Sequence, residues 1–173
     1  MRDSVTSLSE LSEAADALFE TAEVLEDMLA GASAEDLTWL PPDGPWTVVQ
    51  HLCHLRDLER EGFAVRIRLL LDGSSPELPD INGEKLAVER DYLRQDGRKA
   101  LADFASSRKA TLKTLRQLTA DQLSLAGTLE GVGPVTVGKV VSMMLVHDRE
   151  HLDLIDGILR RPVVRPEEPA AVA

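Results

Sequence analysis

Aromatic residues are scarce in this chain, and cysteine is almost absent. Phenylalanine, tryptophan and tyrosine together make up 3% of the 173 residues. A hydrophobic core must therefore be built mainly from leucine, valine, isoleucine and alanine. Cys53 is the only cysteine, which excludes an internal disulfide and favours the reducing cytoplasm as the location.

Long apolar segments are also missing. The first ten residues, MRDSVTSLSE, lack the basic start and the apolar stretch of a secretory signal. No segment approaches the roughly 20 apolar residues that a membrane-spanning helix needs. We therefore expect no membrane partner.

Basic residues are outnumbered, with 19 lysines and arginines against 30 acids and a net charge of −11. Such a surface repels phosphate backbones, so nucleic acid is not an expected partner. The closest approach to a basic cluster is ILRRPVVR, next to a proline-rich end. We expect residues 161–173 to form a flexible tail, because prolines prevent regular pairing, and residues 1–160 to form one domain.

Apolar residues recur at steps of three and four in several segments, which is the pattern of helices with one buried face. Ser7 with Glu10, and Thr47 with Gln50, have the spacing of capping boxes. Thr136 is a suitable first cap for the last helix. The sequence predicts long helices over about 8–30, 48–72, 98–118 and 137–161.

The remaining segments add little regular structure. Residues 83–95 favour a short helix, and the glycine-rich stretch 127–138 favours an extended lead-in to the last helix. Four long helices with short additions predict an all-α fold, a four-helix bundle.

All four histidines fall in two of the predicted helices, as His51 and His54 in one and His147 and His151 in the other. His147 and His151 are four residues apart, so they share one face of their helix. Both occupy places where the apolar pattern expects core residues, and a buried polar ring needs a partner. The pattern favours one metal site between the two helices, while core histidines without a metal remain the alternative.

A site of three neutral imidazoles would leave the charge of a divalent ion uncompensated and coordination positions open. That is typical of a catalytic site and not of a closed structural one. Zinc in such a site lowers the pKa of bound water to about 7, and its charge would also favour a thiolate. Zinc or nickel is the expected metal, and iron or manganese could also bind, because affinity alone does not select the metal.

Few other groups suggest themselves as site residues. Asp57 follows the first histidine pair on the same helix and is a candidate to support the site as a proton acceptor. Tyr92 and Arg108 are further candidates. Cys53 fits a small core residue better than a nucleophile. Acids such as Asp148 are expected to be solvated, and no catalytic base is assigned.

Two motifs resemble segments of the DinB-like superfamily: WTVVQHLCHL at 46–55 and HDREHL at 147–152, in an order and spacing that extend over roughly residues 5–160. The resemblance implies an up-down-down-up bundle, usually dimeric, that holds a divalent metal through three histidines. By position these are His54, His147 and His151. His51 lies outside the implied ligand set and is expected to support or pack against it; periodicity alone does not choose between His51 and His54.

The same resemblance implies an activity. Relatives include thiol-dependent enzymes that transfer bacillithiol or mycothiol sulfur to electrophiles, and one type isomerises maleylpyruvate with mycothiol. The expected function is a metal-dependent S-transferase, whose partners would be a low-molecular-weight thiol, a small electrophile and a second copy in a homodimer. A metal-dependent hydrolase and a non-enzymatic metal-binding protein are the alternatives.

Overall fold

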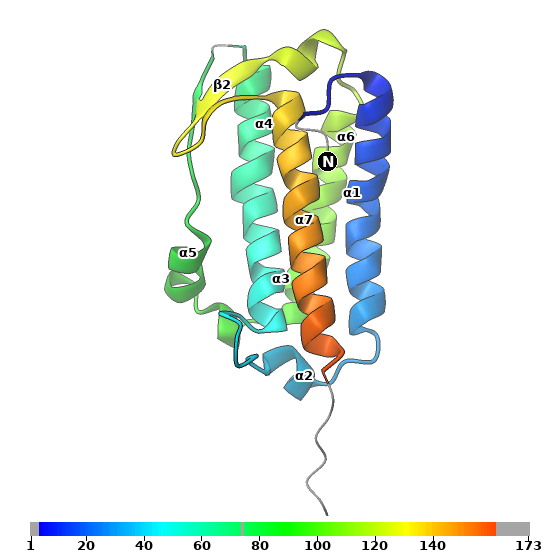
Figure 1. Cartoon of the computed structure of the whole chain (residues 1–173), viewed down its shortest axis with the longest axis vertical. Coiled ribbons are helices and arrows are strands. Elements are labelled where there is room, and N and C mark those ends of the chain that lie inside the picture. Colours follow the sequence, from blue (N-terminus) through cyan, green and yellow to red (C-terminus); the bar gives the residue numbers. More distant parts are fainter. Residues whose placement is uncertain (1–3, 74, 162–173) are drawn as a thin grey trace, which may run out of the picture.

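The computed structural model describes residues 4–73 and 75–161, and four long helical segments dominate it (Figure 1). Helix α1 spans Leu8–Leu29, α6 spans Gly97–Leu115 and α7 spans Val137–Leu159. The second segment joins three consecutive elements, which are α3 (Val48–Asp57), η1 (Leu58–Phe63) and α4 (Ala64–Leu71). This arrangement confirms the predicted four-helix bundle.

The first and last long segments run in one direction and the middle two run in the opposite one, which is the up-down-down-up order that the resemblance implied. Figure 1 shows α1 and α7 descending side by side, while α3–α4 and α6 both ascend. A hydrogen bond of 3.2 Å from the amide of Val5 to the carbonyl of Gly138 ties the starts of α1 and α7 together. Because α4 and α6 follow each other in the chain and are parallel, a long crossover must connect them. It runs outside the bundle and carries β1 (Glu77–Leu78), α5 (Gly83–Glu89) and η2 (Tyr92–Arg94).

The predicted caps start the helices that carry the histidines. Thr47 and Gln50 form a complete capping box at the start of α3. The Thr136 hydroxyl accepts the amide of the third residue of α7, and Ser7 does the same for α1. Each cap satisfies amides that the first turn leaves without a partner, so the boundaries were readable from sequence.

The π-helical turn η1 was not predicted. A π-helical turn accommodates an extra residue and rotates the next residues of the chain relative to an ideal helix. Here it places Glu59 and Phe63 inside the bundle, with exposed fractions of 1% and 3%. The apolar pattern of the sequence passes through this segment without interruption and therefore reads as a plain helix.

A small sheet closes one end of the bundle. The segment expected to be extended forms a hairpin of β2 (Ala126–Leu129) and β3 (Gly133–Thr136), and β1 pairs parallel to β2. The hairpin turn uses positive φ at Gly131 and Gly133. The pairing of β1 joins segments far apart in the chain and had no signal in the sequence. Two short helical elements complete the fold, α2 (Ala34–Thr38) and η3 (Asp121–Ser124).

The hydrophobic core has two parts, separated by a polar layer. The first part includes Leu18 and Met144, and the second includes Leu25, Phe104 and Ile155. Each of the four long segments places a buried polar side chain near the point where its residues of the two parts meet: Thr21, Glu59, Arg108 and Asp148. The histidines of α7 lie on the same stretch of that helix.

The end of the described chain contacts the bundle. The Arg161 guanidinium pairs with Asp36 at 2.7 Å and lies over the ring of Trp39, 4.5 Å from its centroid. The rest of the segment expected to be a flexible tail lies outside the described residues. In the part of the chain that the structure describes, no helix has the length and apolar character needed to cross a membrane.

Candidate metal centre

The two histidine-bearing helices bring their imidazoles together. Nε2 of His54 on α3 lies 3.0 Å from Nε2 of His147 on α7. The ring of His151 lies 4.5 Å from that of His147 and 4.9 Å from that of His54, measured between centroids. Residues about one hundred positions apart in sequence therefore form one cluster, as the motif spacing predicted.

The three rings fit a single metal ion. One nitrogen from each of His54, His147 and His151 can be chosen so that all three lie within 4.8 Å of one another. Two nitrogens bound to one ion through bonds of about 2.1 Å in tetrahedral geometry lie about 3.4 Å apart. The pair at 3.0 Å is close to this value, and nitrogens as much as 4.8 Å apart would have to move closer together to share the ion.

Burial keeps these rings neutral. It lowers the pKa of His51, His54 and His151 to about 4, and a neighbouring imidazole adds to the effect in each case. Burial, with two neighbouring imidazoles, lowers the pKa of His147 to about 2. All four are uncharged at pH 7, so each offers a free lone pair. Within the described residues, Nδ1 of His147, which is not the nitrogen that contacts His54, is buried and has no hydrogen-bond partner.

His51 contacts one histidine of the cluster. Its Nδ1 lies 2.9 Å from Nδ1 of His151, which leaves Nε2 of His151 for an ion. If His151 bound an ion through Nε2, its Nδ1–H would donate to His51, which would fix the orientation of the ring. Partners of this kind set the tautomer of a ligating histidine.

A comparison with known families identifies the chain. The sequence profile of the DinB superfamily matches residues 17–155, which is most of the chain.

The protein belongs to the DinB superfamily.

A solved structure of YfiT from Bacillus subtilis is similar to this DinB-superfamily protein. It is described as a "probable metal-dependent hydrolase with an unusual four-helix bundle topology". The two chains share 21% identity over 92% of this chain and 91% of that one, with a TM-score of 0.84. At this identity the likeness establishes the fold alone. A search of curated proteins gave no match.

Aromatic rings surround the histidines of this DinB-superfamily site. The Trp46 ring lies 4.8 Å from the His54 ring and nearly parallel to that of His151, at 6.2 Å. Phe63 meets His147 edge-on at 5.6 Å. Such contacts restrict the rotation of the imidazoles and lower the local dielectric. Trp46 belongs to the recognised motif, whereas Phe63 reaches the site because of the π-helical turn.

Gly83, at the start of α5, approaches the ring of His54 too closely for any side chain. A β-carbon placed there would lie 2.5 Å from Cε1 and 2.6 Å from Nδ1 of His54. The crossover therefore closes the outer side of this ligand. Sequence reasoning missed this residue, because nothing in a glycine before a short helix indicates a contact with a distant histidine.

Replacing Gly83 with alanine is expected to displace the ring of His54 and weaken metal binding, by about tenfold for a loss of roughly 1.4 kcal/mol. Isothermal titration with Zn²⁺ would measure it. Gly157→Ala is the matched control, because a β-carbon there meets nothing within 4 Å. Equal affinities for the two variants would contradict the proposed contact.

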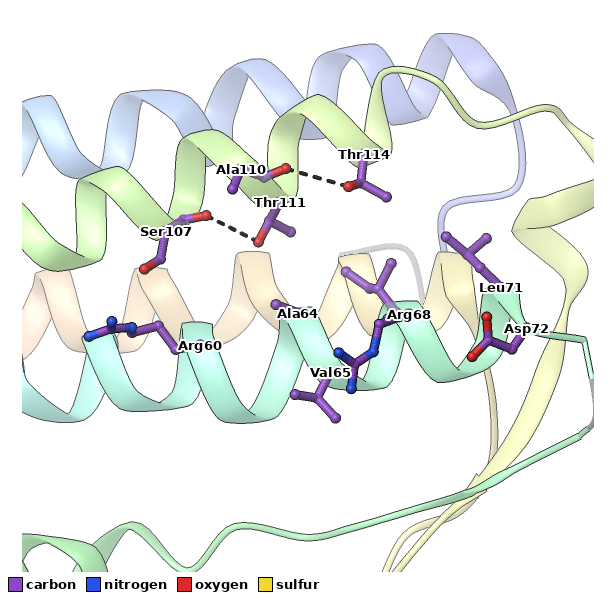
Figure 2. A pocket seen from close by; sticks show the side chains of 11 residues that line it. Arg60, Ala64, Val65, Arg68, Leu71, Asp72, Ser107, Ala110, Thr111 and Thr114 are labelled. Atoms are coloured by element: carbon purple, nitrogen blue, oxygen red, sulfur yellow. Dashed lines mark hydrogen bonds between the residues drawn. The ribbon is translucent and has the colours of Figure 1, made fainter.

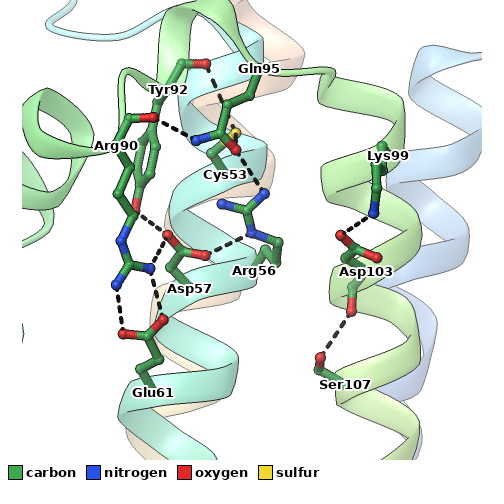
Figure 3. A network of polar contacts seen from close by, with 10 residues as sticks. All are labelled: Cys53, Arg56, Asp57, Glu61, Arg90, Tyr92, Gln95, Lys99, Asp103 and Ser107. Carbon is green, nitrogen blue, oxygen red and sulfur yellow. Dashed lines mark hydrogen bonds and ion pairs between the residues drawn. The ribbon is translucent and has the colours of Figure 1, made fainter.

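Asp57 is engaged by other residues (Figure 3). Its carboxylate accepts hydrogen bonds from Arg56 at 2.7 Å, from Arg90 at 2.7 Å and from the Tyr92 hydroxyl at 2.8 Å. Burial would raise the pKa of Asp57, but these bonds outweigh burial and lower it. The cluster fastens the crossover to α3, so these contacts give no support to Asp57 or Tyr92 as a proton-transfer group.

Arg108 lies in the polar layer, where it connects helices of the bundle. Its guanidinium contacts Glu59 of η1 at 3.0 Å and Asp148 of α7 at 2.6 and 3.0 Å. Thr111 donates to Glu59, and Thr21 donates to Asp148. The expectation that Asp148 is solvated was wrong, because the residue is only 3% exposed and its charge is balanced by Arg108. Burial opposes the charge of Arg108, but the two carboxylates outweigh it and keep its pKa raised.

Cys53 lies in the core, as predicted, with no exposed surface. Burial raises the pKa of its thiol from 9.0 to about 11, which lowers the thiolate fraction at pH 7 about 100-fold. Because the thiolate is the reactive form, we expect Ellman's reagent to modify the folded protein at least about 100-fold more slowly than the protein in guanidinium. Comparable rates would contradict this environment.

Proposed function

We propose that this DinB-superfamily protein is a divalent-metal-dependent S-transferase that joins a low-molecular-weight thiol to a small electrophile. The observation that carries the proposal is the convergence of three neutral imidazoles from two helices: His54 and His151, which are buried, and His147, which is partly buried. Three neutral ligands leave positions open for a substrate. Zinc or nickel is the metal we favour, with iron or manganese as alternatives.

When bound, the metal would act as a Lewis acid that lowers the pKa of a thiol held beside it. In the proposed reaction the thiol loses its proton, and the sulfur attacks a carbon of the electrophile while the carbon–halide bond breaks. The products are a thioether and the hydrogen halide. The chain's part is to hold the site rigid, through His51 behind His151 and through Trp46 beside the rings, and to restrict water.

The distribution of carboxylates favours thiol transfer over hydrolysis. A hydrolase needs a group that removes a proton from water. The three buried acids nearest in sequence to the histidines, Asp57, Glu59 and Asp148, are each paired with arginine. A thiol needs less assistance, because its pKa of about 8.5 is already close to neutrality. Hydrolysis and metal binding without catalysis remain the competing functions.

The decisive assay combines monochlorobimane with mycothiol, bacillithiol or another small thiol, with and without Zn²⁺ or Ni²⁺. We expect a fluorescent thioether only when metal and thiol are both present, and loss of turnover in His151→Ala. Leu154→Ala is the control, because Leu154 lies on the same helix with 51% of its surface exposed. Ester hydrolysis without added thiol would favour the hydrolase, and a metal-loaded protein that uses none of the thiols would overturn the proposal.

The location that we propose follows from this chemistry, whereas the assembly rests on family resemblance. A thiol substrate must be kept reduced, which fits the cytoplasm. A homodimer is the assembly we propose, from family resemblance, and sedimentation equilibrium would measure it.

A further inference from the structure

A groove separate from the histidines lies between α4 and α6 (Figure 2). It has a volume of about 510 Å³. Small side chains create it, with Ala64 on one helix and Ala110 on the other, and Ile67 and Leu71 make further apolar lining. Ser107, Thr111 and Thr114 of α6 complete its polar side, and Figure 2 shows them facing the residues of the opposite helix.

Two arginines on this groove lack the partners that other arginines have. Arg60 and Arg68 are both exposed and both line the groove. Every other arginine in residues 4–73 and 75–161 has an ion pair or a side-chain hydrogen bond. In a chain with eleven more acids than bases, two guanidiniums without a direct ion pair thus lie beside one apolar groove, although Arg60 is near enough to Asp103 to help lower the pKa of that carboxyl.

The positions of these arginines fit the groove. Arg60 of η1 and Arg68 of α4 line the groove on either side of Ala64, as Figure 2 shows. The alanine between them leaves the centre of the groove apolar. Asp72 lies one further turn along, so an anionic group is favoured near the arginines and disfavoured at that end.

We propose that this groove binds a small organic anion with an apolar body. The apolar part would lie against Ala64, Ile67 and Ala110, and its carboxylate, sulfonate or phosphate would pair with Arg60 or Arg68. Guanidinium groups bind such oxyanions through two parallel hydrogen bonds. The volume is within the range of small-molecule sites, which combine an apolar lining with a few polar groups.

The test measures the binding of octanoate by isothermal titration. Octanol, which has the apolar chain without the charge, and sulfate, which has the charge without the chain, are titrated for comparison. We expect octanoate to bind, and octanol and sulfate to bind at least tenfold more weakly. Arg60→Gln combined with Arg68→Gln should weaken octanoate binding at least tenfold. Arg94→Gln combined with Arg149→Gln removes the same charge from exposed arginines outside the groove and should leave it unchanged.

A second pair of variants separates the groove from other sites. Ala110→Leu fills the groove without changing charge, keeps a good helix former at an exposed position, and should weaken octanoate binding. His147→Ala should leave octanoate binding intact, and its loss there would place the anion at the histidines and overturn the proposal. Octanol binding as tight as octanoate binding would overturn the proposal. Dissociation of an oligomer in Ala110→Leu would show that a second copy of the chain covers the groove, and would also overturn it.

Discussion

Replacing His147 with alanine is expected to weaken metal binding at least about 100-fold. The ring supplies one of three nitrogens that converge within 4.8 Å. A structural zinc site of four ligands is worth about 10–16 kcal/mol, so one ligand accounts for about 3 kcal/mol, roughly 100-fold in affinity. Elemental analysis of the purified protein, followed by titration of Zn²⁺ into the chelator-treated variant, would measure the loss.

The same measurement on His51→Ala distinguishes a supporting residue from a fourth ligand. If His51 only fixes the orientation of His151, the variant keeps one metal per chain, with an affinity reduced about tenfold. A loss as large as that in His147→Ala would make His51 a ligand and the site a four-histidine site. Unchanged affinity in His147→Ala would show that the cluster holds no metal.

Much of the bundle could be predicted from sequence, because its signals are local. The helix caps and the apolar residues at steps of three and four both depend on residues within a few positions of one another. The caps are Ser7, Thr47 and Thr136. The π-helical turn and the pairing of Leu78 with Leu129 had no such signal. Both depend on tertiary contacts, which a periodic pattern does not contain.

The histidine cluster was predictable for a different reason. Four histidines confined to two amphipathic helices can be read as a site once the two helices are assumed to be neighbours. The contact of Gly83 with His54 depends on how a 25-residue crossover returns to the bundle, from residue 72 to residue 96. Likewise, the burial of Glu59 depends on the π-helical turn, and so the partners of Arg108 could not be deduced.

Replacing Arg108 with methionine is expected to destabilise the fold by about 3–5 kcal/mol, because it leaves two buried carboxylates without their countercharge. Arg108 is 2% exposed and bridges Glu59 and Asp148, and it also donates to the carbonyl of Leu18 at 3.0 Å. One side chain of α6 thus contacts the other three long segments. Urea denaturation followed by circular dichroism would measure the change.

The control and the rescue decide whether charge is the cause. Arg116→Met removes the arginine that follows the last residue of α6 and whose partner, Asp16, is exposed, so its cost should stay below about 1 kcal/mol. Adding Glu59→Gln and Asp148→Asn to Arg108→Met removes the uncompensated charge and should recover part of the stability, since replacing every member of a buried ion cluster costs less than removing one. A triple variant no more stable than Arg108→Met would show that packing of the arginine, and not its charge, holds the layer together.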